Sequence, residues 1–166
     1  MKKIFCDKIP RITKNRKKLE KALGVKIGNV GKEVSIIGDP EDEYYAGMVI
    51  EALDMGFPFE VALLIKEEDN AFEIINIKDY THKKDFRTIR ARIIGKNGKT
   101  LKVLNDLTEC YFELKGNNVG IIGDPERIKN AQEAVTSIIK GTRQANVYSF
   151  LEKHRVKSII DLGLKG

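Results

Sequence analysis

The clearest alternation of apolar and polar positions lies between residues 124 and 141. Apolar residues recur there three and four positions apart, which predicts an amphipathic helix with one buried face. That face consists of Ile128, Ala131, Ala134, Val135, Ile138 and Ile139. Asp124 and Pro125 are typical of a helix start, and Gly141 is typical of a helix end. A further helix is expected over residues 144–153, with Val147, Phe150 and Leu151 packed inside.

A strand pattern precedes this helix. Cys110, Phe112 and Leu114 alternate with polar or amphipathic residues, which predicts a strand buried on one face. Gly116 and Asn117 then predict a turn into a second strand over residues 119–122. In the first half of the chain, the same criteria predict strands over 2–6, 25–27 and 34–37, with a turn at 28–31. They also predict a helix, turn and helix over 10–23, closed by Gly24, and a helix over 39–55 with Tyr44, Met48, Val49 and Leu53 toward the core.

The chain contains an internal repeat. Residues 34–41 (VSIIGDPE) recur as residues 119–126 (VGIIGDPE), at an offset of 85 positions. Upstream, residues 12–19 align with residues 94–101 at an offset of 82, so the difference falls in a loop between the two matches. We therefore expect two units with the same order of elements. Residues 1–70 would form the first, with a connecting helix, and residues 71–166 the second, with a carboxy-terminal helix.

The segment Gly95-Lys96-Asn97-Gly98 lies between an apolar stretch and the start of a predicted helix. Neither glycine has a Cβ, so a sugar-phosphate strand could approach the main chain closely. The first N–H groups of the following helix and its positive dipole end would face the same strand. A nucleoside-triphosphate P-loop, G-x-x-x-x-G-K-[ST], would require a glycine where this chain has Ile93. The spacing fits the G-x-x-G of a KH domain instead, and the alternative is a plain surface turn.

Charge supports a polyanionic partner. The formal net charge is +6 and the sequence pI is near 9.2. Residues 1–33 are strongly basic, residues 39–69 are acidic, and residues 78–102 are basic again. Segregated blocks of this kind indicate a directed electrostatic surface rather than general solubility.

Other chemistry receives little support from the sequence. Cys6 and Cys110 are far apart and are expected to be small buried residues rather than zinc ligands or a disulfide. His82 and His154 are isolated. Glu41, Asp42 and Glu43 form the densest carboxylate cluster, but the first turn of a helix favours acidic residues in any protein. We therefore expect no catalytic residues, no metal and no cofactor, and a cytoplasmic protein with neither a signal peptide nor a membrane span.

Two units of this kind, one with an intact G-x-x-G and one in which Thr13 and Arg16 replace the glycines, resemble the Partner-of-Nob family of archaeal and eukaryotic small-subunit assembly factors. The segment Gly141-x-x-x-Ala145-Asn146-Val147-Tyr148-x-Phe150-Leu151 is also similar to that family and its KRR relatives. The resemblance implies an α+β fold of two tandem type I KH units, each a three-stranded antiparallel sheet covered by helices on one face. It also implies three partners: single-stranded RNA from the 3′ region of precursor small-subunit rRNA, the Nob endonuclease, and the alpha subunit of translation initiation factor two.

The favoured function is a non-catalytic RNA-binding module for ribosome assembly. The family's RNA contact is carried over only to the intact motif, Gly95, Lys96, Asn97 and Gly98. The neighbouring cations complete the expected RNA-binding set, which adds Lys99, Arg87, Arg90, Arg92 and Lys102. Ile93, Ile94 and Leu101 could be core residues or base contacts. The alternatives are a protein-interaction scaffold that uses the acidic segment 39–69, a KH adaptor outside ribosome assembly and, least favoured, an enzyme.

Overall fold

The computed structural model describes residues 1–67 and 69–155. The chain divides into two compact units, Met1–Phe72 and Glu73–Gly166. The apolar segment 159–164 lies outside the described residues. None of the helices in the described part of the chain has the length and apolar character needed to cross a membrane.

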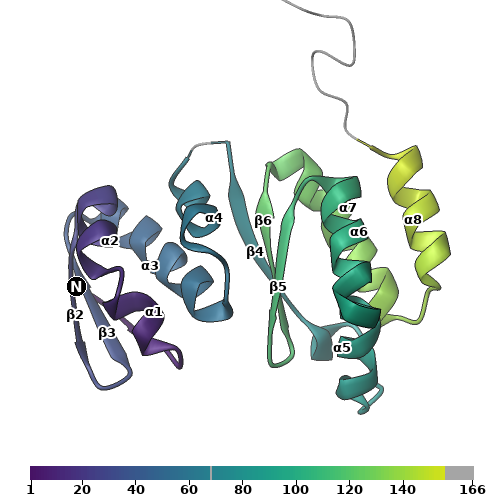
Figure 1. The fold of residues 1–166 in the computed structure, drawn as a ribbon, viewed down its shortest axis with the longest axis horizontal. Helices are drawn as coiled ribbons and strands as arrows, with labels where there is room; N and C mark the ends of the chain where they lie inside the picture. The colour runs from purple at the N-terminus through teal and green to yellow at the C-terminus, as the bar shows by residue number, and fades with distance from the viewer. Residues whose placement is uncertain (68, 156–166) are drawn as a thin grey trace, which may run out of the picture. The chain divides into compact units, whose positions relative to one another are not determined.

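The first unit contains one sheet and a set of helices that lie on one of its faces (Figure 1). Its elements are β1 (Lys2–Phe5), α1 (Ile9–Thr13), α2 (Arg16–Leu23), β2 (Lys26–Val30), β3 (Glu33–Ile37), α3 (Pro40–Met55), α4 (Phe59–Leu63) and a 3-10 turn, η1 (Leu64–Lys66). The strand order is β1-β3-β2, with both pairings antiparallel. Val34 and Ile36 of the central strand are fully buried beneath the helices.

The hairpin of the first unit differs from the sequence prediction. Strand β2 continues to Val30, which pairs with Glu33, so the turn is Gly31-Lys32 rather than residues 28–31. Gly31 has φ +58°, a conformation that glycine adopts without steric cost. Gly28, by contrast, lies within the strand opposite Ser35. The predicted closure of α2 by Gly24 is confirmed, since Gly24 has φ +67°.

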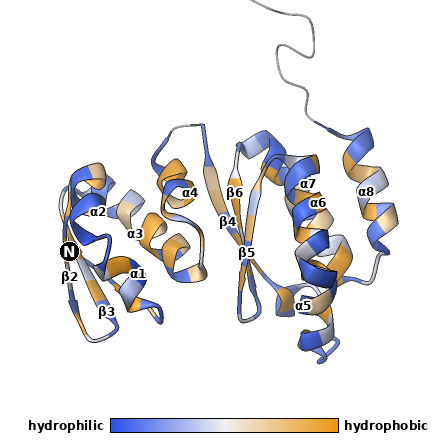
Figure 2. Ribbon diagram, in the orientation of Figure 1, coloured by the Kyte–Doolittle hydropathy of each residue, from blue (hydrophilic) through white to orange (hydrophobic). Residues whose placement is uncertain are grey.

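The buried residues of helix α3 all lie between Ala46 and Met55, and Figure 2 shows apolar residues along the helix. Val49 and Leu53 face the core as expected. The prediction for Tyr44 was wrong, because its side chain is 56% exposed. Its ring lies beneath the Lys2 ammonium group, 5.7 Å from the centroid, and meets the Tyr45 ring edge-on. An aromatic ring near the helix start is therefore stabilised at the surface by a cation rather than by burial.

The second unit repeats the arrangement. Its elements are β4 (Ala71–Asn76), η2 (Ile77–Asp79), α5 (Phe86–Ile94), η3 (Lys96–Gly98), α6 (Lys99–Thr108), β5 (Tyr111–Lys115), β6 (Asn118–Gly123), α7 (Pro125–Ile139) and α8 (Gln144–Lys153). The strand order is β4-β6-β5, and the helices α5, α6 and α7 pack against one another, with α8 against α6 and α7. The mixed α/β prediction with three-stranded antiparallel sheets is confirmed.

The apolar face predicted for α7 is confirmed in full, because all six of its residues are at most 4% exposed. Val147 and Leu151 of α8 are likewise buried, whereas Phe150 is half-buried and stacks on His154 with ring centroids 4.4 Å apart. Cys6 and Cys110 are buried and unbonded to each other, as expected. Burial raises the pKa of the Cys110 thiol to about 11, so at neutral pH it remains a neutral, unreactive core group.

Each unit contains its own tight packing contact at the end of its central strand. A Cβ on Gly123 would lie 2.6 Å from Cys110 Sγ, and a Cβ on Gly38 would lie 2.9 Å from a Val25 methyl group. Gly123 is the last residue of the central strand β6, and Gly38 directly follows the central strand β3. The partner residues, Cys110 and Val25, immediately precede β5 and β2. In the repeated Gly-Asp-Pro motif, the glycine therefore makes a close packing contact, and the aspartate and proline begin the helix that follows.

Candidate nucleic-acid interface

The turn between α5 and α6 has a conformation that most residues avoid. Gly95, at the end of α5, has φ +77° and ψ +170°, and Gly98, before α6, has φ +76° and ψ +11°. Asn97 between them also has positive φ, at +55°. Asparagine tolerates this left-handed region better than most residues with a side chain. The turn is closed by a hydrogen bond from the Gly98 N–H to the Gly95 carbonyl, at 3.2 Å.

The two glycines are required for different reasons. A Cβ on Gly95 would lie 2.2 Å from Thr100 Oγ1 and 2.6 Å from the Thr100 nitrogen, so the first turn of α6 occupies that space. A Cβ on Gly98 would meet nothing within 4 Å. Gly95 therefore determines how closely α6 approaches the turn, while Gly98 leaves the main chain open to a ligand. Thr100 is 5% exposed, and nothing in the local sequence pattern indicates its contact with Gly95.

Helix α6 presents its amino terminus to the same open side. Its N-cap residue, Gly98, makes no side-chain capping bond, so the first N–H groups are not satisfied by a cap. Lys96, Asn97 and Lys99 are exposed at the turn, and Lys102 is exposed one helical turn further on. Helix dipole, backbone donors and ammonium groups together favour an anion at this position.

The three apolar residues near the turn have different environments. Ile93 is fully buried and belongs to the core. Ile94 is 37% exposed, and Leu101 is half-buried. Ile94 and Leu101, rather than Ile93, therefore form an apolar surface beside the turn of residues 95–98, which we call the cradle.

The three arginines of α5 also have different environments. Arg87 is exposed, whereas Arg90 donates a hydrogen bond to Asn117 Oδ1 in the β5–β6 turn. Arg92 donates from Nη1 to the Ile138 carbonyl at 2.9 Å and from Nη2 to the Thr142 carbonyl at 2.7 Å. Ile138 lies in the last turn of α7 and Thr142 just beyond the helix, where the helix dipole favours a cation. The Ile138 carbonyl also accepts from the Gly141 N–H at 3.0 Å. Arg92 thus ties the end of α5 to the end of α7, and an RNA contact for it remains a prediction.

The first unit contains the same device. Arg11 donates from Nε to the Leu53 carbonyl at 2.7 Å and from Nη2 to the Phe57 carbonyl at 2.6 Å, at the end of α3. These acceptors correspond to Ile138 and Thr142 under the 85-residue offset of the repeat. We call each of these interactions an arginine clamp. Arg11 could not be predicted from the sequence, because only the carbonyls that it bonds show that it is equivalent to Arg92.

The turn of the first unit differs from the cradle. Lys14 and Asn15 both have negative φ, and their N–H groups donate to the carbonyls of Pro10 and Ile12 at 3.1 Å. The Asn15 side chain donates to the Arg11 carbonyl at 2.8 Å. With Thr13 and Arg16 in place of glycines, this turn uses its donors internally and lacks the open left-handed path of residues 95–98.

Helix α5 begins with a well-formed cap. Asp85 accepts hydrogen bonds from the Thr88 hydroxyl at 2.7 Å and from the Thr88 N–H at 3.2 Å. These two bonds lower the pKa of Asp85. The Asp85 carboxylate is thereby committed to the helix start, and it does not oppose an anion at the other end of α5.

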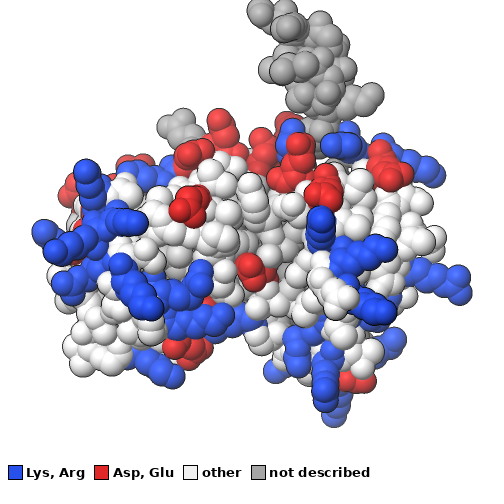
Figure 3. Space-filling view, in the orientation of Figure 1, with Lys and Arg blue, Asp and Glu red and all other residues white. Residues whose placement is uncertain are grey.

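Positive charge gathers around this site. Figure 3 shows Lys and Arg side chains over α5, α6 and the lower end of the second unit. Within residues 1–67 and 69–155, no three His, Cys, Asp or Glu side chains are grouped as a metal site would require. The surface is therefore suited to an extended polyanion.

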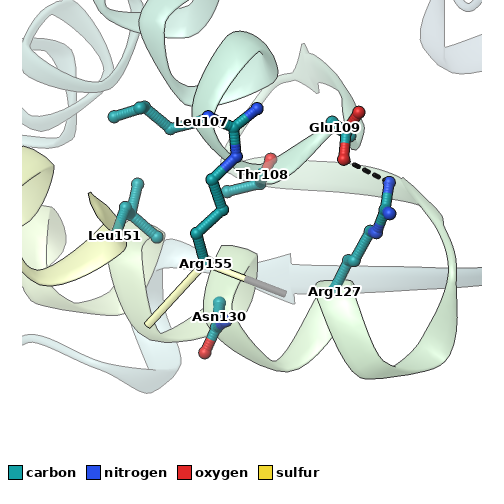
Figure 4. A pocket seen from close by; sticks show the side chains of 7 residues that line it. All are labelled: Leu107, Thr108, Glu109, Arg127, Asn130, Leu151 and Arg155. Carbon is teal, nitrogen blue, oxygen red and sulfur yellow. Dashed lines mark ion pairs between the residues drawn. The ribbon is translucent and has the colours of Figure 1, made fainter. Parts of the chain in front are cut away.

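A small pocket lies on the opposite end of α6, lined by Leu107, Thr108, Glu109, Arg127, Asn130, Leu151 and Arg155 (Figure 4). Arg127 and Glu109 point toward each other across it and form an ion pair. Its cavity volume of about 10 Å³ admits about one water molecule. This pocket does not accommodate a substrate, and the cradle remains the candidate site.

Replacing Gly95 with alanine should destabilise the second unit much more than replacing Gly98. The Gly95→Ala change forces a Cβ into Thr100 and into a backbone region that is nearly exclusive to glycine, at a cost of about 3 kcal/mol or more. Gly98→Ala meets open space and should cost about 1–2 kcal/mol for its left-handed φ. Chemical denaturation followed by circular dichroism measures both. Equal losses would contradict the close contact with Thr100.

The Arg92 clamp should contribute to stability. Arg92→Gln leaves two carbonyls at the end of α7 without their charged donor and should cost about 2–3 kcal/mol. Arg87→Gln, an exposed change of the same kind on the same helix, should cost about 0.5 kcal/mol or less. The comparison uses the same denaturation measurement, and a loss from Arg87→Gln as large as that from Arg92→Gln would argue against the clamp.

Comparisons with known proteins agree with this geometry. Residues 71–156, just over half of the chain, match the family model for the second KH domain of PNO1 proteins, described as a eukaryotic-type KH domain, KH-domain type I. A KH domain-containing protein from Methanocaldococcus jannaschii is 34% identical over 149 residues. That match covers 86% of this chain and 66% of the relative, so the chain spans somewhat less than two thirds of that protein.

Solved structures extend the similarity over both units. Dim2p from Pyrococcus horikoshii OT3 superposes with a TM-score of 0.84 at 27% identity, covering 92% of this chain and 98% of that one. A chain from the a/eIF2α–aDim2p–rRNA complex of the same organism gives a TM-score of 0.82 at 28% identity, covering 92% of each chain. A protein of unknown function from Aeropyrum pernix, 23% identical with a TM-score of 0.81, shares the fold over 92% of this chain and 90% of its own. The chain therefore belongs to the Partner-of-Nob family of KH-domain proteins, the family of archaeal Dim2p.

Proposed function

We propose that this chain is a non-catalytic ribosome assembly factor that binds single-stranded RNA in the 3′ region of precursor small-subunit rRNA. The observation that carries the proposal is the turn of residues 95–98. It leaves the main chain open at Gly98, directs the amino terminus of α6 outward and surrounds that end with exposed lysines. A KH groove uses such a turn to clamp the backbone of about four nucleotides.

In this proposal the cradle and the apolar surface have separate tasks. The backbone N–H groups with Lys96, Asn97 and Lys99 hold phosphates, which sets the register of the strand without reading its sequence. Ile94 and Leu101 supply apolar contact for unstacked bases beside the turn. Arg87 and Lys102 add charge along the strand, while Arg90 and Arg92 mainly support the site through their internal bonds.

We further propose that both units are type I KH units in tandem, with the first a degenerate one. The same strand order, the shared packing glycines and the paired arginine clamps support this assignment. Its boundaries would be residues 1–70 and 71–166, close to the division between Phe72 and Glu73.

The proposed partners besides RNA are proteins. A structurally similar chain occurs in a complex with a/eIF2α and rRNA, which supports the alpha subunit of initiation factor two as a partner. Membership of the Partner-of-Nob family supports the Nob endonuclease as a second one. An assembly factor with these partners would act in the cytoplasm.

Binding should prefer single strands and weaken with salt. A single strand offers unstacked bases to the groove, whereas A-form duplex RNA presents mainly its backbone and shallow groove. Each lysine contact to phosphate also releases a counterion, so affinity should fall linearly on a log–log plot against salt. Fluorescence anisotropy with one labelled RNA, alone and annealed to its complement, measures both effects. Equal affinity for the two forms would contradict a KH groove.

Reversing charge at the turn should abolish most RNA binding without unfolding the protein. Lys96→Asp with Asn97→Asp places two carboxylates where a phosphate would lie, while both glycines keep the backbone path and aspartate tolerates the left-handed position of Asn97. Lost attraction and added repulsion together cost about 2–3 kcal/mol, so affinity should drop on the order of a hundredfold.

The matched control is Lys129→Asp with Asn146→Asp, which makes the same change in net charge at exposed positions of α7 and α8. It should lower affinity several-fold at most, through the weaker positive potential. Circular dichroism confirms that both variants are folded. Similar losses from the two variants would mean that general charge, rather than the cradle, accounts for binding.

A further inference from the structure

A second basic surface lies between β4 and α5, away from the G-x-x-G turn in the sequence. Residues 77–85 connect these elements, and Lys78, Tyr80, His82, Lys83 and Lys84 are all exposed there. Tyr80 is 40% exposed, one of the few large rings at the surface of the described residues. The segment holds Lys78, Lys83 and Lys84 against Asp79 and Asp85, and the Asp85 carboxylate is turned to the start of α5, where it caps the helix.

The ring of Tyr80 is held in place by a lysine from another element. Lys140, the residue that ends α7, places its ammonium group over the ring, 5.9 Å from the centroid. A cation in this position orients the aromatic ring. Lys140 is itself exposed, so its charge remains accessible to a ligand beside the ring. We call this pair the Tyr80–Lys140 platform.

A short chain of contacts within the second unit joins the platform to the cradle. Lys140 is two residues before Thr142, whose carbonyl accepts from Arg92 Nη2 at 2.7 Å. Arg92 in turn is three residues before Gly95, and its own carbonyl accepts from Gln144 Nε2 at 3.3 Å. The Arg92 clamp therefore brings the end of α7, with Lys140 and the exposed Arg143, to the last turn of α5, where the cradle begins.

We propose that bound RNA continues beyond the groove onto the Tyr80–Lys140 platform, where one base stacks on Tyr80 and Lys140 pairs with an adjacent phosphate. This rests on the proposed RNA binding at the cradle and extends its footprint. Single-stranded RNA fits because aromatic rings flanked by cations are the recurring means of holding a strand without reading its sequence. The platform offers one ring and several ammonium groups, which suits a nucleotide better than the broad apolar area of a protein interface.

The platform predicts that a change at Tyr80 affects only long RNA. Binding would be compared for a short RNA of about four nucleotides, which fills one KH groove, and for a single strand of about ten nucleotides. Loss of one stacked base corresponds to roughly a tenfold drop in affinity. Tyr80→Leu, which keeps apolar bulk but removes the ring, should therefore weaken the long RNA about tenfold and leave the short RNA unchanged. Tyr80→Phe, the matched control, should bind both RNAs as the unchanged protein does.

A second variant tests the other residue of the platform, Lys140. Lys140→Gln should weaken the long RNA and reduce the salt dependence of its binding, because one phosphate contact is lost. No change for either RNA, or equal losses for both, would overturn the platform. If Tyr80→Leu instead impaired binding of the purified alpha subunit of initiation factor two and spared RNA, the surface would belong to a protein partner and the proposal would fail.

The cradle variant distinguishes the two proposals. If Lys96→Asp with Asn97→Asp removes binding of both RNAs while Tyr80→Leu and Lys140→Gln affect neither, RNA binding at the cradle stands and the platform is overturned. If the unchanged protein binds neither RNA at low salt, both proposals fail together.

Discussion

The close approach of Gly95 to Thr100 is the constraint on which the candidate site depends. Because a Cβ on Gly95 would lie 2.2 Å from Thr100 Oγ1, helix α6 can start where it does only if residue 95 has no side chain. The chain then takes a left-handed path over Asn97 and Gly98 into the first turn of α6. The packing that places α6 at this turn also leaves its first N–H groups without a side-chain cap, and exposed lysines lie beside them.

The arginine clamps extend this constraint to the whole unit. In each unit, an arginine from the helix before the turn donates to two carbonyls, one in the last turn of α3 or α7 and one just beyond that helix. A guanidinium group suits this role because its fixed donors can reach two carbonyls at once and it stays charged. The first unit lacks both turn glycines but keeps the clamp and the packing glycine Gly38. Both units therefore contain the clamp and the packing glycine, whereas only the second contains the two turn glycines.

The two basic surfaces of the second unit follow from the same framework. The sequence predicts that Arg92 binds RNA, yet two of its N–H groups donate to backbone carbonyls inside the protein. By doing so it places the end of α7 beside the end of α5, and it carries Lys140 and Arg143 toward the cradle. Arg92 can thus influence the charged surface without being part of it. It holds the backbone at the end of α7, and that backbone carries the exposed Lys140 and Arg143.

Local sequence patterns were sufficient to predict the mixed α/β class, the internal repeat, the buried face of α7, the bounds of α8 and the position of the turn at residues 95–98. These rest on local periodicity and on glycine, proline and aspartate signals, which act over a few residues. Long-range packing, by contrast, sets the hydrogen bonds of Arg92 and Arg11 to carbonyls some 40 to 50 positions away. It also makes Ile93 a core residue while Ile94 is exposed, and it leaves Tyr44 at the surface. The hairpin turn of the first unit also begins at Gly31 rather than at Gly28, because pairing with β3 sets its register. Such outcomes depend on which distant backbone or side chain occupies the neighbouring space, and periodicity along the chain carries no information about that.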